Sequence, residues 1–177
     1  MTRVLILFAH PALHRSRINA ALIEAVQGME GVTFRDLYEE YPNLNIDFET
    51  EQELLLEHDI IVWQHPFYWY SAPAILKEWL DVVLEYGFAY GEGGTRLAGK
   101  KVMSALTTGG PAEAYQRGGY NHYTLKELLA PFDQTARLCG MEYLEPFVIQ
   151  NVRQLTNEEV QKWAALYRQR VLELRNL

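Results

Sequence analysis

The segment from His10 to Asn19 places hydroxyl, amide and guanidinium groups directly after a hydrophobic stretch. Ser16 precedes residues with helical spacing, so we expect it to cap a helix. The free N–H groups and the dipole of a helix start favour an anion, the dipole by roughly 0.3–1 kcal/mol. Arg15 or Arg17 adds positive charge. The segment therefore indicates a phosphate site, although an ordinary serine cap followed by a solvated charged loop would use the same residue types.

A second segment carries four aromatic residues in a row after another hydrophobic stretch. They are Phe67, Tyr68, Trp69 and Tyr70. Loops run over the surface, where aromatic rings are costly unless something covers them. A planar ring system or a partner subunit would cover them. They could instead plug the end of the core or form a dimer contact.

The third segment reads Thr107, Thr108, Gly109, Gly110. Two glycines let a backbone approach a ligand closely and leave N–H groups free. Such donors suit the carbonyl and nitrogen edge of an isoalloxazine ring, whose negative charge on reduction they would stabilise. A simple turn at the end of a strand is the commoner meaning of two adjacent glycines.

Hydrophobic periodicity predicts the elements that must position these segments. Continuous β-branched and aromatic runs predict strands at residues 3–9, 32–38, 59–64, 100–106 and 143–150, the last weakened by Pro146. Helical spacing and start signals predict helices at residues 17–29, from Thr50 with Glu53, from Ser71 and Pro73 to about 86, from Thr124 with Glu127, and from Thr156 with Glu159. Pro131 should bend or break the fourth helix.

Strands that alternate with helices predict one α/β domain spanning residues 1–177, with a parallel five-stranded sheet and helices on both faces. The chain length suits the doubly wound order 2-1-3-4-5 of a flavodoxin-like three-layer sandwich, in which ligands bind outside the carboxyl ends of the strands. All three segments then meet at one site. A phosphate at the first and a planar ring at the other two describe flavin mononucleotide (FMN).

Composition excludes several other classes. The net charge of −7 argues against nucleic acid as a partner. The lone Cys139 forms no disulfide within the chain, which suits a reducing cytoplasm, and we expect it to be buried. No apolar run is long enough to span a bilayer, and no cluster shows metal-ligand spacing. We expect His58 to be exposed, and Trp63, Trp79 and Trp163 to pack in the core or an interface. The acidic residues at 39–40 and 49–53 are most simply a solvated face, with a docking surface as the alternative.

Short motifs over most of the chain resemble the flavodoxin-like NAD(P)H:quinone oxidoreductases. They are AHP at 9–11, S-x-x-N at 16–19, LYxxYPxxNID at 37–47, WQHPxxWYS at 63–71, LKxWLD at 76–81, YGxGG at 90–94, LxGK at 97–100 and TTGG at 107–110. Within that family the chain is similar to the ancillary proteins of glutathione-regulated potassium-efflux antiporters, the KefF and KefG type.

The resemblance implies an FMN site and names its residues. The phosphate and ribityl chain would contact His10, Ser16, Arg17, Ile18 and Asn19; the flavin ring would lie between Phe67, Tyr68, Trp69 and Tyr70 and the segment Thr107, Thr108, Gly109 and Gly110. Some relatives use FAD instead. A tyrosine and a histidine assist the hydride step in quinone reductases, and Tyr115 and His122 are the candidates, with Asn121 at the spacing of the histidine.

The same resemblance implies NAD(P)H as donor, a quinone as acceptor, and a homodimer whose sites are lined by both subunits. It also implies a protein of the cytoplasm that binds the cytoplasmic side of a potassium-efflux antiporter, at the inner membrane. Two other interpretations stay open: a regulatory subunit of the antiporter whose redox activity is secondary, and a one-electron carrier of the flavodoxin type. The glycine-rich hydroxyl loop of such carriers is missing after the first strand.

Overall fold

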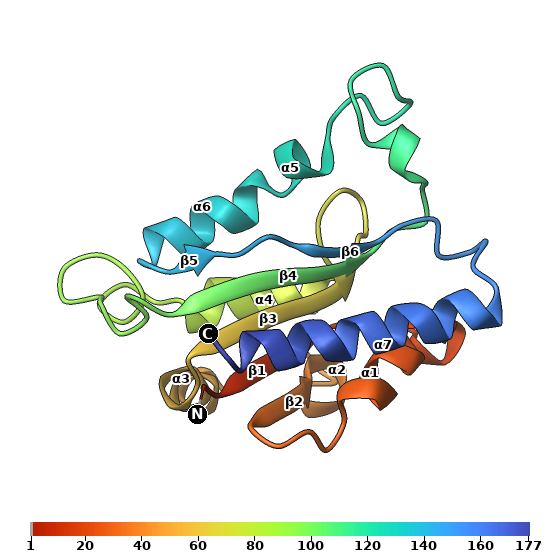
Figure 1. Cartoon of the computed structure of the whole chain (residues 1–177). Helices are drawn as coiled ribbons and strands as arrows, with labels where there is room; N and C mark the ends of the chain where they lie inside the picture. Colours follow the sequence, from red (N-terminus) through yellow and green to blue (C-terminus); the bar gives the residue numbers. More distant parts are fainter. Residues whose placement is uncertain (1) are drawn as a thin grey trace.

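The computed structural model describes residues 2–177 and arranges them in three layers, with a parallel sheet between two layers of helices (Figure 1). Its strands are β1 (Val4–Phe8), β2 (Val32–Asp36), β3 (Ile60–Pro66), β4 (Lys101–Thr107), β5 (Glu142–Tyr143) and β6 (Phe147–Ile149). The order is β2-β1-β3-β4-β5, and every pairing is parallel. The predicted fold and strand order are confirmed.

The strand predicted at 143–150 is two short strands. Both β5 and β6 pair with β4, one beside its start and the other beside its end. Pro146 lies between them and has no N–H group to donate to a neighbouring strand. The proline therefore divides the fifth strand position into two.

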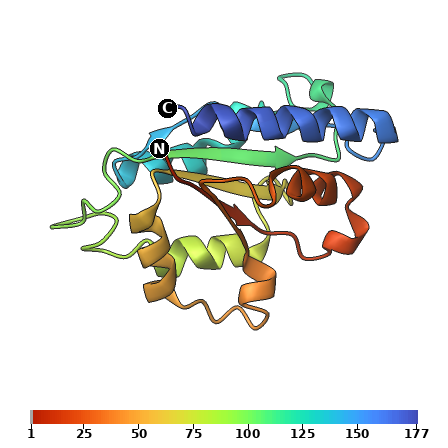
Figure 2. The same ribbon diagram turned by 60° about the horizontal axis from the view of Figure 1, so that its bottom comes forward.

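Helices cover both faces of the sheet. They are α1 (Arg17–Val26), α2 (Leu37–Glu40), α3 (Phe48–Glu57), α4 (Ala74–Val83), α5 (Leu125–Leu128), α6 (Ala130–Leu138) and α7 (Asn157–Leu174), with short 3₁₀ turns η1 (Leu13–Arg15) and η2 (Ala112–Ala114). One core cluster joins the sheet to α1 and α7, and the other joins it to the helices from α2 to α6. Figures 1 and 2 show α7 running along the sheet with α1 beside it.

Three predicted helix starts are confirmed, among them Ser16 as the cap of α1, and two are wrong. Thr124 and Thr156 each form a capping box with the glutamate three residues later. Helix α3, however, starts before Thr50, because the Asp47 side chain accepts from the Thr50 backbone N–H at 3.2 Å. Helix α4 begins after Pro73 without any side-chain cap, so Ser71 does not cap it.

Pro131 breaks its helix as expected. α5 ends at Leu128, and α6 starts two residues later with the proline in its first turn, where no N–H group is required.

Trp63 and Trp79 are fully buried in the core, and Trp163 packs edge-on against Phe147, with the ring centroids 5.9 Å apart. Cys139 is also buried, as predicted, and burial raises the pKa of its thiol.

The prediction that His58 is exposed is wrong. Its ring is fully buried, with Nδ1 2.6 Å from the Leu54 carbonyl and Nε2 2.7 Å from the Thr33 hydroxyl. Since a carbonyl only accepts, Nδ1 donates to it, and in the neutral ring Nε2 then accepts from the Thr33 hydroxyl. Burial accordingly lowers its pKa. The ammonium group of Lys100 donates to the carbonyl of His58 at 2.6 Å, near the end of α3.

Glu51 is a second correction, because this member of the predicted solvated stretch is completely buried. Its carboxylate accepts from Arg35 Nε at 2.6 Å, from the Tyr41 hydroxyl at 2.8 Å and from Trp79 Nε1 at 2.9 Å. A buried charge is tolerated only when it is paired and hydrogen-bonded in this way. Burial, followed by the bond to Glu51, raises the pKa of Tyr41 to about 12. The network joins β2, α3 and α4.

His65 should make stability depend on pH. Its ring is fully buried and stacks on Phe132 at 5.5 Å, and burial lowers its pKa to about 4 from 6.5. The unfolded chain therefore takes up this proton first as pH falls. Neutral His65 therefore makes its full contribution to the free energy of unfolding above pH 6.5. This contribution declines towards pH 4, where roughly 3 kcal/mol should be lost.

Urea unfolding of wild type and His65→Phe at pH 7, 5 and 4 checks this expectation, because phenylalanine keeps the stacking and cannot titrate. As pH falls, the free energy of unfolding should decrease more for the wild type than for the variant. Equal pH dependence of the two unfolding free energies would contradict it.

Candidate functional site

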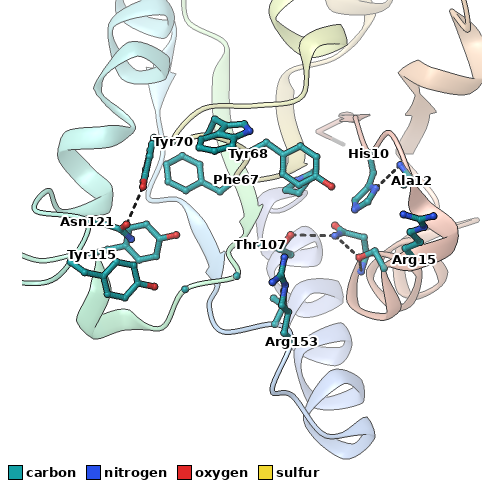
Figure 3. A pocket seen from close by; sticks show the side chains of 18 residues that line it. His10, Ala12, Arg15, Phe67, Tyr68, Tyr70, Thr107, Tyr115, Asn121 and Arg153 are labelled. Atoms are coloured by element: carbon teal, nitrogen blue, oxygen red, sulfur yellow. Dashed lines mark hydrogen bonds between the residues drawn. The ribbon is translucent and has the colours of Figure 1, made fainter.

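A cavity of about 530 Å³ opens outside the carboxyl ends of β1, β3 and β4, where the sheet order changes direction. Figure 3 shows side chains from all three predicted segments around it. Members of segments 10–19, 66–70 and 107–110 line it, together with residues from 115–121 and from the loop after β6. Residues far apart in the chain therefore share one pocket.

Ser16 and Asn19 form the polar corner of this cavity. The Ser16 hydroxyl caps α1 and accepts from the backbone N–H and the Nδ2 of Asn19, at 3.3 and 2.9 Å. The same amide donates to the Thr107 hydroxyl at 3.2 Å, which joins the first loop to the third. Asn19 Oδ1 is buried and accepts no hydrogen bond from the described residues. A buried acceptor calls for a donor, and a ligand hydroxyl would supply one.

His10 presents a donor to the cavity. Its Nδ1 accepts from the Ala12 backbone N–H at 3.0 Å, so the proton of the neutral ring lies on Nε2. Burial lowers the pKa of His10, which keeps the ring neutral. The imidazole stands edge-on to the Tyr68 ring at 6.0 Å.

The aromatic loop lies along the opposite side of the cavity. Phe67 is buried, whereas Tyr68, Trp69 and Tyr70 are 41%, 91% and 48% exposed. Trp69 and Tyr70 have φ angles of 49° and 62°, a left-handed backbone that costs of order 1 kcal/mol or more per residue. Such strain is typical of sites whose surroundings impose it. Here it turns two large rings outward at the mouth of the cavity.

The TTGG segment is held by backbone hydrogen bonds and is tightly packed at one glycine. A Cβ added to Gly110 would lie 2.9 Å from the Tyr120 hydroxyl and 3.2 Å from the Tyr115 ring. At Gly109, chain neighbours aside, the one atom of residues 2–177 within 4 Å of an added Cβ is Arg153 Nε, at 3.9 Å. A side chain at Gly110 would therefore have to displace the hydroxyl end of the exposed Tyr120 side chain, whereas the space beside Gly109 is open.

Four predicted site residues do not line the cavity. The Arg17 guanidinium donates to Asn157 and to the Leu155 carbonyl. The side chain of Ile18 belongs to the core, and the buried Thr108 hydroxyl donates to the Gly110 carbonyl at 2.8 Å. His122, with a φ of 63°, also lies outside the lining, and its neighbour Asn121 is within it. The other predicted residues, Tyr115 included, line the cavity.

Two loops beyond the predicted segments complete the mouth. The Tyr70 hydroxyl donates to Asn121 Oδ1 at 3.2 Å, which connects the aromatic loop to the segment after η2. Burial raises the pKa of Tyr115, so its hydroxyl stays protonated and able to donate. Sequence reasoning missed Tyr120 and Arg153, for which no motif gives a signal.

The cavity is electropositive in an acidic protein. The chain has a net charge of −7, yet the lining contains the guanidinium groups of Arg15 and Arg153 and no carboxylate. Together with the N-terminus of α1, these charges favour an anionic ligand. Among residues 2–177, no group of histidine, cysteine and carboxylate side chains could hold a metal ion. None of the helices described is long and apolar enough to cross a membrane.

Comparisons with known proteins agree with this geometry. A family model described as "Flavodoxin-like fold" matches residues 2–171. The ancillary protein KefG of the glutathione-regulated potassium-efflux system from Serratia proteamaculans is 48% identical over 165 residues, which are 93% of this chain and 90% of KefG.

Two solved structures extend the comparison. General stress protein 14 of Treponema denticola, in complex with FMN, has a TM-score of 0.93 and 38% identity, covering 97% of this chain and 99% of that one. An NADPH-quinone reductase from P. pentosaceus has a TM-score of 0.86 and 34% identity, covering 96% and 97%. The chain therefore belongs to the flavodoxin-like family, with KefG ancillary proteins and quinone reductases among its relatives.

Proposed function

We propose that the cavity binds FMN and that the protein is an NAD(P)H:quinone oxidoreductase. The observation that carries this proposal is the meeting of three strand-end segments around one cavity with a polar corner at one side and aromatic rings at the other. The buried, unpaired Asn19 Oδ1 and the open space beside Gly109 fit a phosphorylated ligand with hydroxyl groups and a flat ring. Relatives described as FMN-bound and as quinone reductases support the same assignment.

Each part of the cavity would hold a different part of the flavin. The N-terminus of α1 with Ser16, Asn19 and Arg15 would bind the phosphate, and the backbone N–H groups of Arg17 and Ile18 lie in the same first turn. His10 would donate to the ligand through Nε2. The rings of residues 67–70 and the backbone of residues 107–110 would flank the isoalloxazine.

The flavin, when bound, would supply hydride transfer between NAD(P)H and the quinone. The side chains of the protein would bind and orient the flavin and the two substrates. The exposed rings of Tyr68 and Trp69 provide flat surfaces for planar substrates. The protonated Tyr115 would donate a hydrogen bond to the quinone oxygen. His122 is the second proposed catalytic residue; it follows Asn121, whose side chain reaches the cavity.

Partners belong to the same proposal. The rings of Trp69, Tyr70 and Tyr120 are exposed around the cavity mouth, where a second copy of the chain would cover them in a homodimer. The 48% identity to KefG supports an ancillary role at the cytoplasmic face of a potassium-efflux antiporter. A catalytically inactive variant that still activated the antiporter would place regulation ahead of turnover. FAD is the alternative cofactor.

Purification without added cofactor tests the flavin site. We expect a yellow protein that releases FMN on denaturation and oxidises NAD(P)H steadily when a quinone is present. Apo-protein should gain about 2.7 kcal/mol of stability from FMN at a hundredfold excess over the dissociation constant. The absence of any thermal shift with FMN or FAD would contradict the cofactor. Flavin binding without two-electron turnover would favour the one-electron carrier.

A further inference from the structure

Arg153 is a cation in the cavity to which the proposed function assigns no part of the ligand. Its Nε lies 3.9 Å from the position that a Cβ on Gly109 would take, and Figure 3 shows the side chain extending towards Thr107. Within residues 2–177 it forms no hydrogen bond or ion pair, and no carboxylate lines the cavity beside it. An unpaired guanidinium in the lining of a ligand pocket is suited to pairing with a negative charge.

Backbone hydrogen bonds place the Cα of Arg153 beside the TTGG segment, and its side chain is exposed. The loop that carries Arg153 is hydrogen-bonded to the TTGG segment, from Asn151 N to the Gly110 carbonyl at 3.0 Å and from Val152 N to the Thr108 carbonyl at 3.1 Å. Asn151 has a left-handed backbone with a φ of 55°, and its carbonyl accepts from Gln154 N at 3.0 Å. Arg153 therefore sits on a tight turn attached to the loop that would contact the flavin ring.

The two arginines of the cavity differ in what lies beside them. Arg15 belongs to η1, directly before Ser16 and the start of α1, where the phosphate would bind. Arg153 lies beside Gly109, where the polar edge of the ring would bind. The charge of a phosphate is the same in both redox states of the ligand. The charge of the ring changes.

On the basis of the proposed function, we propose that Arg153 stabilises the negative charge of reduced FMN. A hydride carries two electrons and one proton, so on transfer NAD(P)H would leave as NAD(P)⁺ and bound FMN would gain one negative charge unless a second proton followed from water. A guanidinium beside the ring edge favours the charged, reduced form over the oxidised form. Arg153 would thus set the redox potential of the site.

The test measures the dissociation constant of oxidised FMN and the midpoint potential of bound FMN in wild type, Arg153→Gln, Arg153→Lys and Arg15→Gln. Arg153→Gln should weaken binding of reduced FMN about tenfold more than binding of oxidised FMN. That ratio makes the potential about 30 mV more negative for a two-electron couple. Arg153→Lys keeps the charge and should restore most of the potential.

Arg15→Gln is the matched control, because the same charge is removed at the phosphate end. It should weaken both redox forms equally and leave the potential unchanged. An unchanged potential in Arg153→Gln, or an equal loss for both redox forms, overturns the proposal for Arg153 and leaves the flavin site intact. Wild-type protein that binds no flavin overturns the proposed function, and the role of Arg153 with it.

Discussion

Gly109→Leu should give a protein that folds normally and purifies without flavin. Among the described residues beyond its chain neighbours, an added Cβ meets Arg153 Nε alone, at 3.9 Å, so the chain has room for a Cβ here. That room belongs to the cavity, and a leucine would take up the space where we place the ring edge. We expect FMN affinity to fall at least a hundredfold, which is about 2.7 kcal/mol. Visible absorbance and FMN titration of the purified variant measure this.

Ala165→Leu is the matched control for this variant. It adds the same side chain at an exposed position of α7, away from the cavity, and should bind FMN like the wild type. The thermal stability of apo Gly109→Leu should equal that of apo wild type. A yellow Gly109→Leu protein with wild-type affinity would show that the ring does not approach this loop.

Glu51→Ala should destabilise the protein by about 3–5 kcal/mol, a large part of the stability of an ordinary domain. The substitution removes the carboxylate on which Arg35, Tyr41 and Trp79 converge. The Arg35 side chain, which is only 17% exposed, then keeps Glu40 as its remaining ion-pair partner, at 3.3 Å. The substitution also leaves the fully buried indole N–H of Trp79 without its acceptor. Urea unfolding at neutral pH measures the loss.

Glu53→Ala provides the comparison, because this exposed glutamate lies on the same helix and should change stability by less than about 0.5 kcal/mol. The loss of stability in Glu51→Gln should lie between those of Glu51→Ala and Glu53→Ala, since the amide oxygen still accepts hydrogen bonds but the ion pair is lost. None of the network residues lines the cavity, so folded Glu51→Ala should retain flavin. A Glu51→Ala protein as stable as Glu53→Ala would contradict the assignment.

The fold could be predicted from the sequence because its determinants are local and repeated. The buried strands are continuous apolar runs, and their alternation with helices leaves few topologies. The environments of Glu51 and His58 could not be predicted in the same way. Their burial depends on partners such as Arg35, Trp79 and Thr33, which are brought close only by the folded chain. A charged or polar residue met in a sequence gives no sign of such partners.

The candidate site, like the fold, could be predicted in part from the sequence. Three segments could be placed together because each follows a strand of the predicted sheet, and they do meet at one cavity. Arg153 could not be placed, because its position depends on backbone hydrogen bonds made after the three-residue strand β6. The choice between Arg15 and Arg17 likewise depends on Asn157, at the start of α7, which accepts from Arg17.

The interruption between β5 and β6 has a consequence for how copies of this protein behave at high concentration. An outer strand with a continuous row of free N–H and C=O groups is a template on which a foreign strand can add, and this is a common start of aggregation. Here that side of the sheet offers strands of only two and three residues, separated by the exposed Glu145 and by Pro146. An incoming strand would meet a charge and a missing donor before it had formed a stable ladder.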